Sequence, residues 1–415
     1  MQNLAAMQVL VWSDRHPLEL RLLAMGRLIV EEETVFWWSA NRWWPRVDDP
    51  EMAAAIGKRV VEHGRVDVIP GLLNRWSLTP PSDAEQERME FRVFEQLMAP
   101  ETVRQSLWRC VADQAHETKG SAEVARSAWV VLCRLDDEST RRAVLAQRSG
   151  TSALWTDLNA AAVLLDQLPE THEGLRWLAA LRQQERYWQQ LEERKDSLIE
   201  EAAAGWQIRH LGILANASEE LLATDQDELQ GELAREWSQV IRVPREQPVG
   251  EEVAIELGDQ RTWSWPDLAL VWNVMRAMDE PSVVRAWFDQ ADADLLDTGS
   301  EFGGVLTWKP DGSFVAVGFT PEQREGDRKF FSSPALIEAM YTGLAHYHFH
   351  AQEHHNAEYA GPGRGDLAFT ANLETHTLTL TFINRDQINV DLAFPDGRVL
   401  DLGLVTRPRG GAAGQ

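Results

Sequence analysis

The stretch AHYHFHAQEHH, residues 345–355, holds five of the chain's eleven histidines. Its alternation predicts an extended strand in which His346, His348 and His350 share one face and Tyr347 and Phe349 share the other. The two aromatic side chains would bury the strand inside a domain. Two histidines spaced H-x-H can then reach a single ion through their imidazole nitrogens, so the stretch predicts a rigid metal site.

The histidine pair needs a third ligand, because a catalytic zinc commonly takes three protein ligands and keeps one open position. Asp366 in YAGPGRGDL follows a turn rich in glycine and proline, which can bring its carboxylate back over the end of the strand. His354 and His355 are rival ligands. His346 is an alternative ligand as well, since the H-x-H pair can be read as 346/348 or as 348/350.

Hydrolysis at such a centre also needs a general base, and a glutamate outside the coordination shell suits that role. Glu301 in DTGSEFGGVLTW lies at the start of a predicted strand. The two glycines that follow it allow close approach of another backbone. Glu301 is therefore the candidate base.

The three motifs read E-F-G-G-V-L, H-Y-H-F-H and P-G-R-G-D in chain order. Their order and spacing resemble the JAMM (MPN-type) metalloprotease family, whose pattern is E-x-G-G-x-L, then H-x-H at a strand end, then P-S-x-x-D. The resemblance covers roughly residues 255–405 and implies an αβα sandwich. It implies that His348, His350 and Asp366 bind zinc, and that Glu301 activates a water to cleave a peptide or isopeptide bond in a protein or peptide substrate. A ubiquitin-like modifier is one candidate substrate.

Three features depart from the family pattern. Gly363 stands at the serine position and removes a hydroxyl that in the family helps to hold the water or polarise the carbonyl. One such donor contributes about 3 kcal/mol of transition-state stabilisation. Ala351 replaces the usual proline, and the sixteen positions from His350 to Asp366 are more than the family has. These departures leave open a catalytically inactive JAMM-like module that serves as a binding or scaffold domain.

The H-x-H pair, followed by Glu353 and Gly361, also resembles the first motif of a cupin. A cupin needs a second motif with a later histidine. The one histidine available is His376 in ETHTLTL, and it lacks the glycine and proline frame of that motif. A cupin-like metal protein is therefore the lesser alternative.

The residue composition and hydrophobic patterning along the chain predict an α+β protein with four regions. Residues 1–78 mix short β-like runs (QVLVW, RLIVEEETVFWW, RVDVIPGLL) with the helix DPEMAAAIGKRVVEHG, and predict a small mixed α/β region. Residues 84–242 are rich in helix formers and predict a helical region that could recruit a protein substrate. Residues 251–405 form the JAMM-like metal-binding domain, and 406–415 read as a disordered tail.

Turn signals divide the C-terminal region into elements. Two helical segments, WPDLALVWNVMRAM and PSVVRAWFDQADADLL, precede the hairpin GGVLTW-KPDG-SFVAVGF. The segment SSPALIEAMYTG predicts a short helix with Ser333 as its N-cap. Strands are predicted at TLTLTFI and on both sides of the turn in INVDLAF-PDG-RVLDLG.

Composition limits the class of partner. Asp and Glu outnumber Lys and Arg by 65 to 40, a net charge of -25, which argues against binding to nucleic acid or to an anionic membrane surface. The two cysteines, Cys110 and Cys133, read as reduced core residues. No signal peptide and no membrane-length apolar run is recognised, so a cytoplasmic location is predicted. The sequence carries no signal for the oligomeric state.

Overall fold

The structure of the protein is a computed structural model, and the residues that it describes are 2–113, 119–243, 253–258, 263–322 and 330–409. The chain divides into two compact units, Met1–Ala161 and Ala162–Gln415. Within the described residues, no helix is both long and apolar enough to cross a bilayer.

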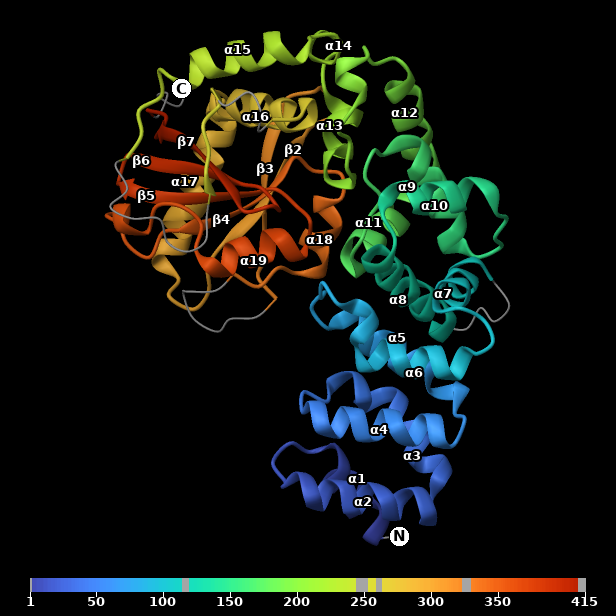
Figure 1. Ribbon diagram of the computed structural model, residues 1–415. Coiled ribbons are helices and arrows are strands. Elements are labelled where there is room, and N and C mark those ends of the chain that lie inside the picture. The colour runs from blue at the N-terminus through green and yellow to red at the C-terminus, as the bar shows by residue number, and fades with distance from the viewer. Residues whose placement is uncertain (1, 114–118, 244–252, 259–262, 323–329, 410–415) are drawn as a thin grey trace. The chain divides into compact units, whose positions relative to one another are not determined.

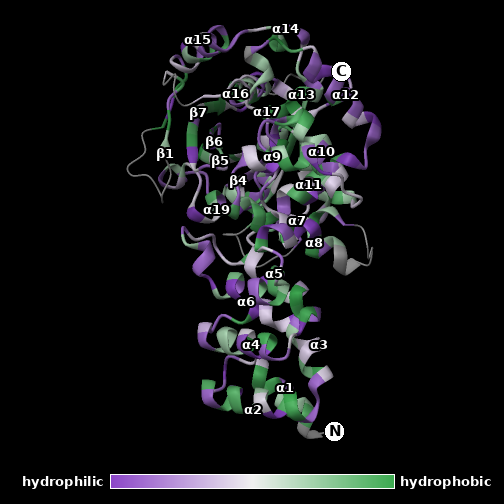
Figure 2. Cartoon of the chain, turned by 45° about the vertical axis from the view of Figure 1, so that its right-hand side comes forward, coloured by the Kyte–Doolittle hydropathy of each residue, from purple (hydrophilic) through white to green (hydrophobic). Residues whose placement is uncertain are grey.

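The described residues of the first unit form helices and no strands. The α-helices are α1 Gln2–Trp12, α2 Leu18–Glu31, α3 Glu33–Trp43, α4 Pro50–Glu62, α5 Ile69–Leu78, α6 Met89–Met98, α7 Val103–Ala112, α8 Lys119–Leu135, α9 Glu138–Gln147 and α10 Ala153–Leu164, the last of which runs past the unit boundary. Short 3-10 turns are η1 Trp44–Arg46, η2 Val66–Val68 and η3 Glu85–Glu87. Helices α4 and α6 carry both hydrophobic and hydrophilic residues (Figure 2), as helices packed on one side require.

The strands predicted within residues 1–78 are wrong, because this region is helical throughout its described elements. Helix α2 shows the reason: its buried residues include Met25, Leu28 and Ile29, which recur at the helical spacing of three or four and not at the strand spacing of two. The β-branched runs were too short to outweigh the surrounding Leu, Arg, Met and Glu. The predicted helix at 49–64 is confirmed as α4, whose first turn is capped by the Asp49 carboxylate.

The second unit begins with helices and ends in a sheet. Its first elements are α11 His172–Arg182, α12 Glu185–Asp196, η4 Glu201–Ala203, η5 Ile208–His210, α13 Leu211–Asn216, α14 Glu219–Leu222 and α15 Gln226–Trp237. The rest are β1 Val253–Ala254, α16 Trp265–Met278, α17 Pro281–Leu296, β2 Gly303–Trp308, β3 Phe314–Phe319, α18 Pro334–Met340, β4 Ala345–His350, η6 Ala357–Tyr359, α19 Arg364–Asn372, β5 Thr377–Asn384, β6 Gln387–Ala393 and β7 Arg398–Thr406. The predicted hairpin, both predicted helices before it and the helix capped by Ser333 are confirmed.

The sheet has the strand order β1-β7-β6-β5-β4-β2-β3. Figure 1 labels the strands from β2 to β7. Strands β4 and β5 run parallel, as do β1 and β7, while the other neighbours are antiparallel. The parallel β4–β5 connection passes through α19, which is the crossover that a parallel pair requires. The α+β class is confirmed.

Helices lie on both faces of this sheet. On one face Tyr347 of β4 donates a hydrogen bond from its hydroxyl to Gln290 of α17 (2.8 Å). On the other face the ring of His346 packs against Phe369 of α19, with centroids 4.9 Å apart. Val305 of β2, which pairs with His346, belongs to a core cluster with α18. The sheet is therefore the middle layer between α17 and the pair α18 and α19.

The limits of the predicted regions differ from the division of the structure. Residues 79–84 connect α5 to η3 and α6 inside the first unit, and the boundary near 244–252 lies outside the described residues. Two residues of the predicted tail at 406–415 are ordered parts of the domain, because Thr406 belongs to β7 and Arg407 forms an ion pair with Asp292 at 2.7 Å. Residues 410–415 lie outside the described part of the chain.

Gly304 allows the close strand packing that sets the register of β4. A Cβ atom at this position would lie 2.1 Å from the Val317 carbonyl oxygen and 2.4 Å from the Tyr347 hydroxyl. Strands β2, β3 and β4 would have to move apart to admit it. The two glycines of E-F-G-G-V-L therefore serve the close approach that the sequence predicted.

We expect Gly304→Ala to lower the free energy of unfolding by about 1–3 kcal/mol, the usual cost of overpacking a tight core. The matched control is Gly231→Ala in α15, where no described atom lies within 4 Å of the new Cβ. The control should be neutral or more stable by about 1 kcal/mol, because alanine favours helix. Urea denaturation of both variants measures the difference, and equal midpoints would contradict the packing argument.

Candidate metal centre

Strand β4 presents its histidines as the alternation predicted. His346, His348 and His350 point to the face that α19 covers, while Tyr347 and Phe349 are fully buried on the opposite face. The strand pairs with β2 on one side and with β5 on the other, so backbone hydrogen bonds fix its register from both directions. This places the H-x-H motif at the carboxyl end of a central strand.

The structure brings His348, His350 and Asp366 together. His348 Nε2 lies 3.2 Å from Asp366 Oδ1, and His350 Nε2 lies 3.4 Å from Asp366 Oδ2. One ligand atom from each residue lies within 4.8 Å of the other two. Asp366 is held in place from the first turn of α19, because its Oδ2 also accepts a hydrogen bond from the Gly363 backbone N–H at 2.7 Å.

The protonation of His350 is fixed by its other ring nitrogen. Nδ1 lies 3.0 Å from the Tyr359 carbonyl oxygen, which can only accept, so Nδ1 carries the proton. In the neutral ring Nε2 then directs a lone pair at the Asp366 carboxylate. Two lone pairs at this distance repel unless a proton or a cation lies between them. A histidine whose outer nitrogen donates to a carbonyl is the usual arrangement of a metal ligand.

The electrostatics of the centre agree with this geometry. Burial alone would raise the pKa of Asp366, but His348 and His350 lower it well below its usual value. Burial would lower the pKa of His350, but the hydrogen bond and charge of Asp366, the Tyr359 carbonyl and the charge of Glu301 raise it. The site therefore stabilises positive charge beside the carboxylate, and two imidazole nitrogens with one carboxylate oxygen are a donor set that zinc accepts.

His346 lies outside this cluster although it shares the same face. Its ring packs between Phe330 and Phe369, at 5.3 and 4.9 Å, and next to His348 at 5.8 Å. Burial holds its pKa well below the usual value, so the ring is neutral. The geometry favours the 348/350 register over 346/348.

The rival ligands also lie elsewhere. The ring of His354 packs on Phe382 of β5 at 5.2 Å, and His355 Nδ1 lies 3.3 Å from the Ile383 carbonyl. Residues 351–363, which connect the H-x-H pair to α19, therefore fold against the end of β5. In doing so they bring the Tyr359 carbonyl to His350.

Glu301 lies beside the centre, directly before β2. The ladder between β2 and β4 continues through a hydrogen bond from the Phe349 N–H to the Phe302 carbonyl (3.1 Å), which sets Glu301 next to His350. Both line a cleft of about 460 Å³. The described residues that line it are Glu301, His350, Gln352, Glu353, Asn356 and Tyr359. The candidate base thus reaches solvent at the same cleft as the candidate ligand.

Sequence reasoning did not find Gln352, Asn356 and Tyr359 as parts of the site. Tyr359 acts through a backbone carbonyl, which any residue would supply, so the sequence holds no signal for it. Asn356 is 1% exposed in a loop, and its amide bonds the His350 carbonyl (3.1 Å) and Gln352 (3.2 Å). An asparagine in a polar loop is common, and only its burial reveals this role.

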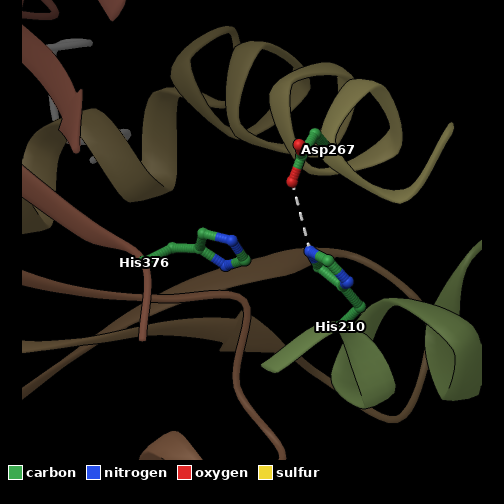
Figure 3. Close-up of side chains that lie close together, drawn as sticks. All are labelled: His210, Asp267 and His376. Atoms are coloured by element: carbon green, nitrogen blue, oxygen red, sulfur yellow. Dashed lines mark ion pairs between the residues drawn. The ribbon is translucent and has the colours of Figure 1, made fainter. Parts of the chain in front are cut away.

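A second cluster of two histidines and one aspartate lies in the same unit (Figure 3). His210 Nε2 faces Asp267 Oδ1 at 3.3 Å, and the rings of His210 and His376 lie 5.2 Å apart. All three side chains are buried. His210 comes from η5, Asp267 from the first turn of α16, and His376 precedes β5.

Hydrogen bonds to other groups argue against a metal at this second cluster. The Gln207 backbone N–H donates to His210 Nδ1 at 3.2 Å, so Nδ1 keeps its lone pair and Nε2 of the neutral ring carries the proton. Asp267 Oδ2 also accepts a hydrogen bond from Arg398 (2.8 Å), and His376 Nε2 accepts one from Arg209 (3.1 Å). A proton on the facing nitrogen and two guanidinium groups disfavour a cation. His376 is engaged here, so the structure does not unite it with the H-x-H pair as a cupin requires.

Comparisons with protein-family models, with curated proteins and with solved structures gave no match for this chain. The resemblance to the JAMM family therefore depends on the three motifs and on the geometry described above.

The second cluster makes stability depend on pH. Burial lowers the pKa of His210 to about 4, whereas an unfolded histidine titrates near 6.5. Below pH 6.5 the unfolded chain takes up a proton that the folded chain refuses, so stability falls as the pH drops from about 6.5 to 4. At pH 5 this one residue should cost about 2 kcal/mol relative to pH 7.

We expect His210→Gln to flatten this dependence by about that amount, because glutamine has no proton to gain. Urea unfolding of wild type and variant at pH 7, 6 and 5 measures the change. Comparing the two proteins cancels the titration of the other histidines. Identical slopes against pH in both proteins would show that His210 is not held neutral.

Proposed function

We propose that the chain is a zinc-dependent hydrolase of the JAMM type that cleaves a peptide or isopeptide bond in a protein substrate. The observation that carries the proposal is the pair of imidazole Nε2 atoms directed at the Asp366 carboxylate, with the His350 Nδ1 proton committed to Tyr359. A ubiquitin-like modifier is the substrate class that the family resemblance favours. Figure 1 shows β4 and α19, which supply the ligands.

The residues present divide the chemistry among them. His348, His350 and Asp366 would hold zinc, which when bound supplies the Lewis acidity that activates water and polarises a carbonyl. Glu301, at the same cleft as His350, would take the proton of the attacking water as the new C–O bond forms. It would pass that proton to the leaving amine as the C–N bond breaks, so the glutamate ends as it began.

An inactive binding module is the second candidate, and Gly363 favours it. Its backbone N–H holds Asp366, but it has no side chain to donate a hydrogen bond to a substrate oxygen. A Cβ at Gly363 would meet only Asp366 Oδ2, at an ordinary 3.4 Å, so space does not explain why serine is missing. The two candidates share the metal site and differ in turnover.

The first test is metal content. We expect purified protein to hold about one zinc per chain, and His348→Ala to lose it, because two remaining ligands bind zinc far more weakly than three. Inductively coupled plasma mass spectrometry measures the ratio.

Two controls make this test specific. His355→Ala removes an exposed histidine of the same segment and should keep the zinc. His346→Gln should also keep it, because His346 lies outside the cluster. His348 is a ligand in both registers, so His350→Ala distinguishes them: zinc that is kept in His350→Ala but lost with His346→Gln would reverse the register.

The second test is turnover. We expect Glu301→Gln to lower kcat for an isopeptide-linked diubiquitin or a fluorogenic ubiquitin amide by about 10²–10⁴-fold, the usual contribution of a general base. The zinc content should stay the same, since Glu301 is not a ligand.

Glu353→Gln is the matched control, because Glu353 lines the same cleft and is exposed. It should leave kcat within about twofold of wild type, the scale of a rim charge that does not take part in proton transfer. Zinc-loaded protein that cleaves neither probe would favour the binding module. Full activity in Glu301→Gln would contradict the role of the base.

A further inference from the structure

A chain of side-chain amides links the end of β4 to the candidate base. Asn356 is anchored at its backbone, where its N–H donates to the Phe382 carbonyl of β5 at 2.9 Å. Its Nδ2 donates to the His350 carbonyl (3.1 Å) and to Gln352 Oε1 (3.2 Å). The buried amide therefore contacts the strand that carries the ligands and fixes the oxygen end of Gln352.

Gln352 in turn holds Glu301. Because Asn356 donates to the amide oxygen of Gln352, the nitrogen end must face the other way, and Gln352 Nε2 donates to Glu301 Oε1 at 3.2 Å. If the Gln352 amide were flipped, its carbonyl oxygen would face the Glu301 carboxylate, and its NH2 group would face the NH2 group of Asn356. The orientation of Gln352 is thus determined from both sides.

We propose that Gln352 is the positioning residue of the general base: it fixes the Glu301 carboxylate beside His350 so that the base meets the attacking water. This inference rests on the proposed function. The segment 351–363 then contributes more than a longer connection, because through Gln352, Asn356 and the Tyr359 carbonyl it orients both the base and a metal ligand.

Such positioning matters more in this chain than in one with a serine at residue 363. A hydroxyl there would be a second group able to order the water or the substrate carbonyl. Without that hydroxyl, ordering of the attacking water depends more on the position of Glu301. A displacement of about 1 Å in a catalytic group can cost about 10²-fold in rate. The backbone pairing beyond β2 places the main chain of Glu301, and Gln352 contacts its carboxylate directly.

The test compares Gln352→Ala with Glu301→Gln, the double variant and Glu358→Gln, all in the full chain. Glu358 is an exposed residue of the same segment that does not line the cleft. Gln352→Ala should lower kcat for the ubiquitin amide by about 10–100-fold, with KM within about twofold and the zinc content unchanged. Added to Glu301→Gln it should have no further effect, because the residue acts through Glu301. Glu358→Gln should match wild type.

A second readout does not need turnover. Acetohydroxamate binds a metal and presents a hydroxyl to a neighbouring carboxylate, so its affinity for the Co²⁺-loaded protein reports where Glu301 lies. Visible absorption should show binding weakened about tenfold in both Gln352→Ala and Glu301→Gln, and no more in the double variant.

Each outcome decides the inference. Wild-type affinity and kcat in Gln352→Ala, with Glu301→Gln impaired, would reject the positioning role and leave the proposed function standing. Loss of zinc in Gln352→Ala, or an additive effect in the double variant, would also reject it, because the residue would then act on the ligands or on the fold. Wild-type protein that binds neither zinc nor Co²⁺ would overturn the proposed function and the role of Gln352 with it.

Discussion

The candidate centre depends on the single proton that a neutral imidazole can offer. His350 Nδ1 donates its hydrogen bond to the Tyr359 carbonyl, and the remaining lone pair on Nε2 faces Asp366 Oδ2 at 3.4 Å. The repulsion between that lone pair and the carboxylate must be relieved by a proton or a cation. The register of β4, the first turn of α19 and the folded segment 351–363 all act on this one contact, since each places one of its three partners.

The second cluster shows that residue types and distances alone do not define a metal site. His210, Asp267 and His376 repeat the two-histidine, one-carboxylate set within the same 4.8 Å limit. There, however, a backbone N–H donates to Nδ1 of His210, so the ring proton is on Nε2, which faces Asp267. Two arginines already donate hydrogen bonds to His376 and Asp267. Opposite tautomers therefore give the same residues different chemistry: one cluster favours a cation, and the other is an internal network that ties α16, η5 and β7 together.

Most of the sheet was predictable because its signals are local. The turns KPDG and PDG, the Ser333 cap and the alternation of AHYHFH each depend on residues a few positions apart, and the structure forms all of them. The strands expected in the first 78 residues failed because runs such as QVLVW have no alternation and pack as helices against other helices. What decided those segments was tertiary packing, which short runs do not encode.

The residues of the candidate site also differ in how far the sequence alone indicates them. His348, His350, Asp366 and Glu301 could be chosen as candidates from the sequence because each is a chemically specific side chain in a motif. Tyr359, Asn356 and Gln352 were missed because a carbonyl and two amides in a polar loop look like any solvated connection.

Under the proposed function, the segment 351–363 and the glycine at its end would act on catalysis together. A chain with glycine at this position lacks one ordered donor that a serine would supply, and transition-state stabilisation depends on donors that are fixed before the reaction begins. The longer segment supplies fixed donors of its own, since Asn356 is buried and Gln352 is oriented at both ends of its amide. A polar group anchored by backbone contacts to β5 can be as well ordered as a hydroxyl at a helix N-terminus. Under the proposed function, the glycine at 363 and the longer segment before it are thus better understood as one departure from the pattern that the sequence resembles than as two independent defects.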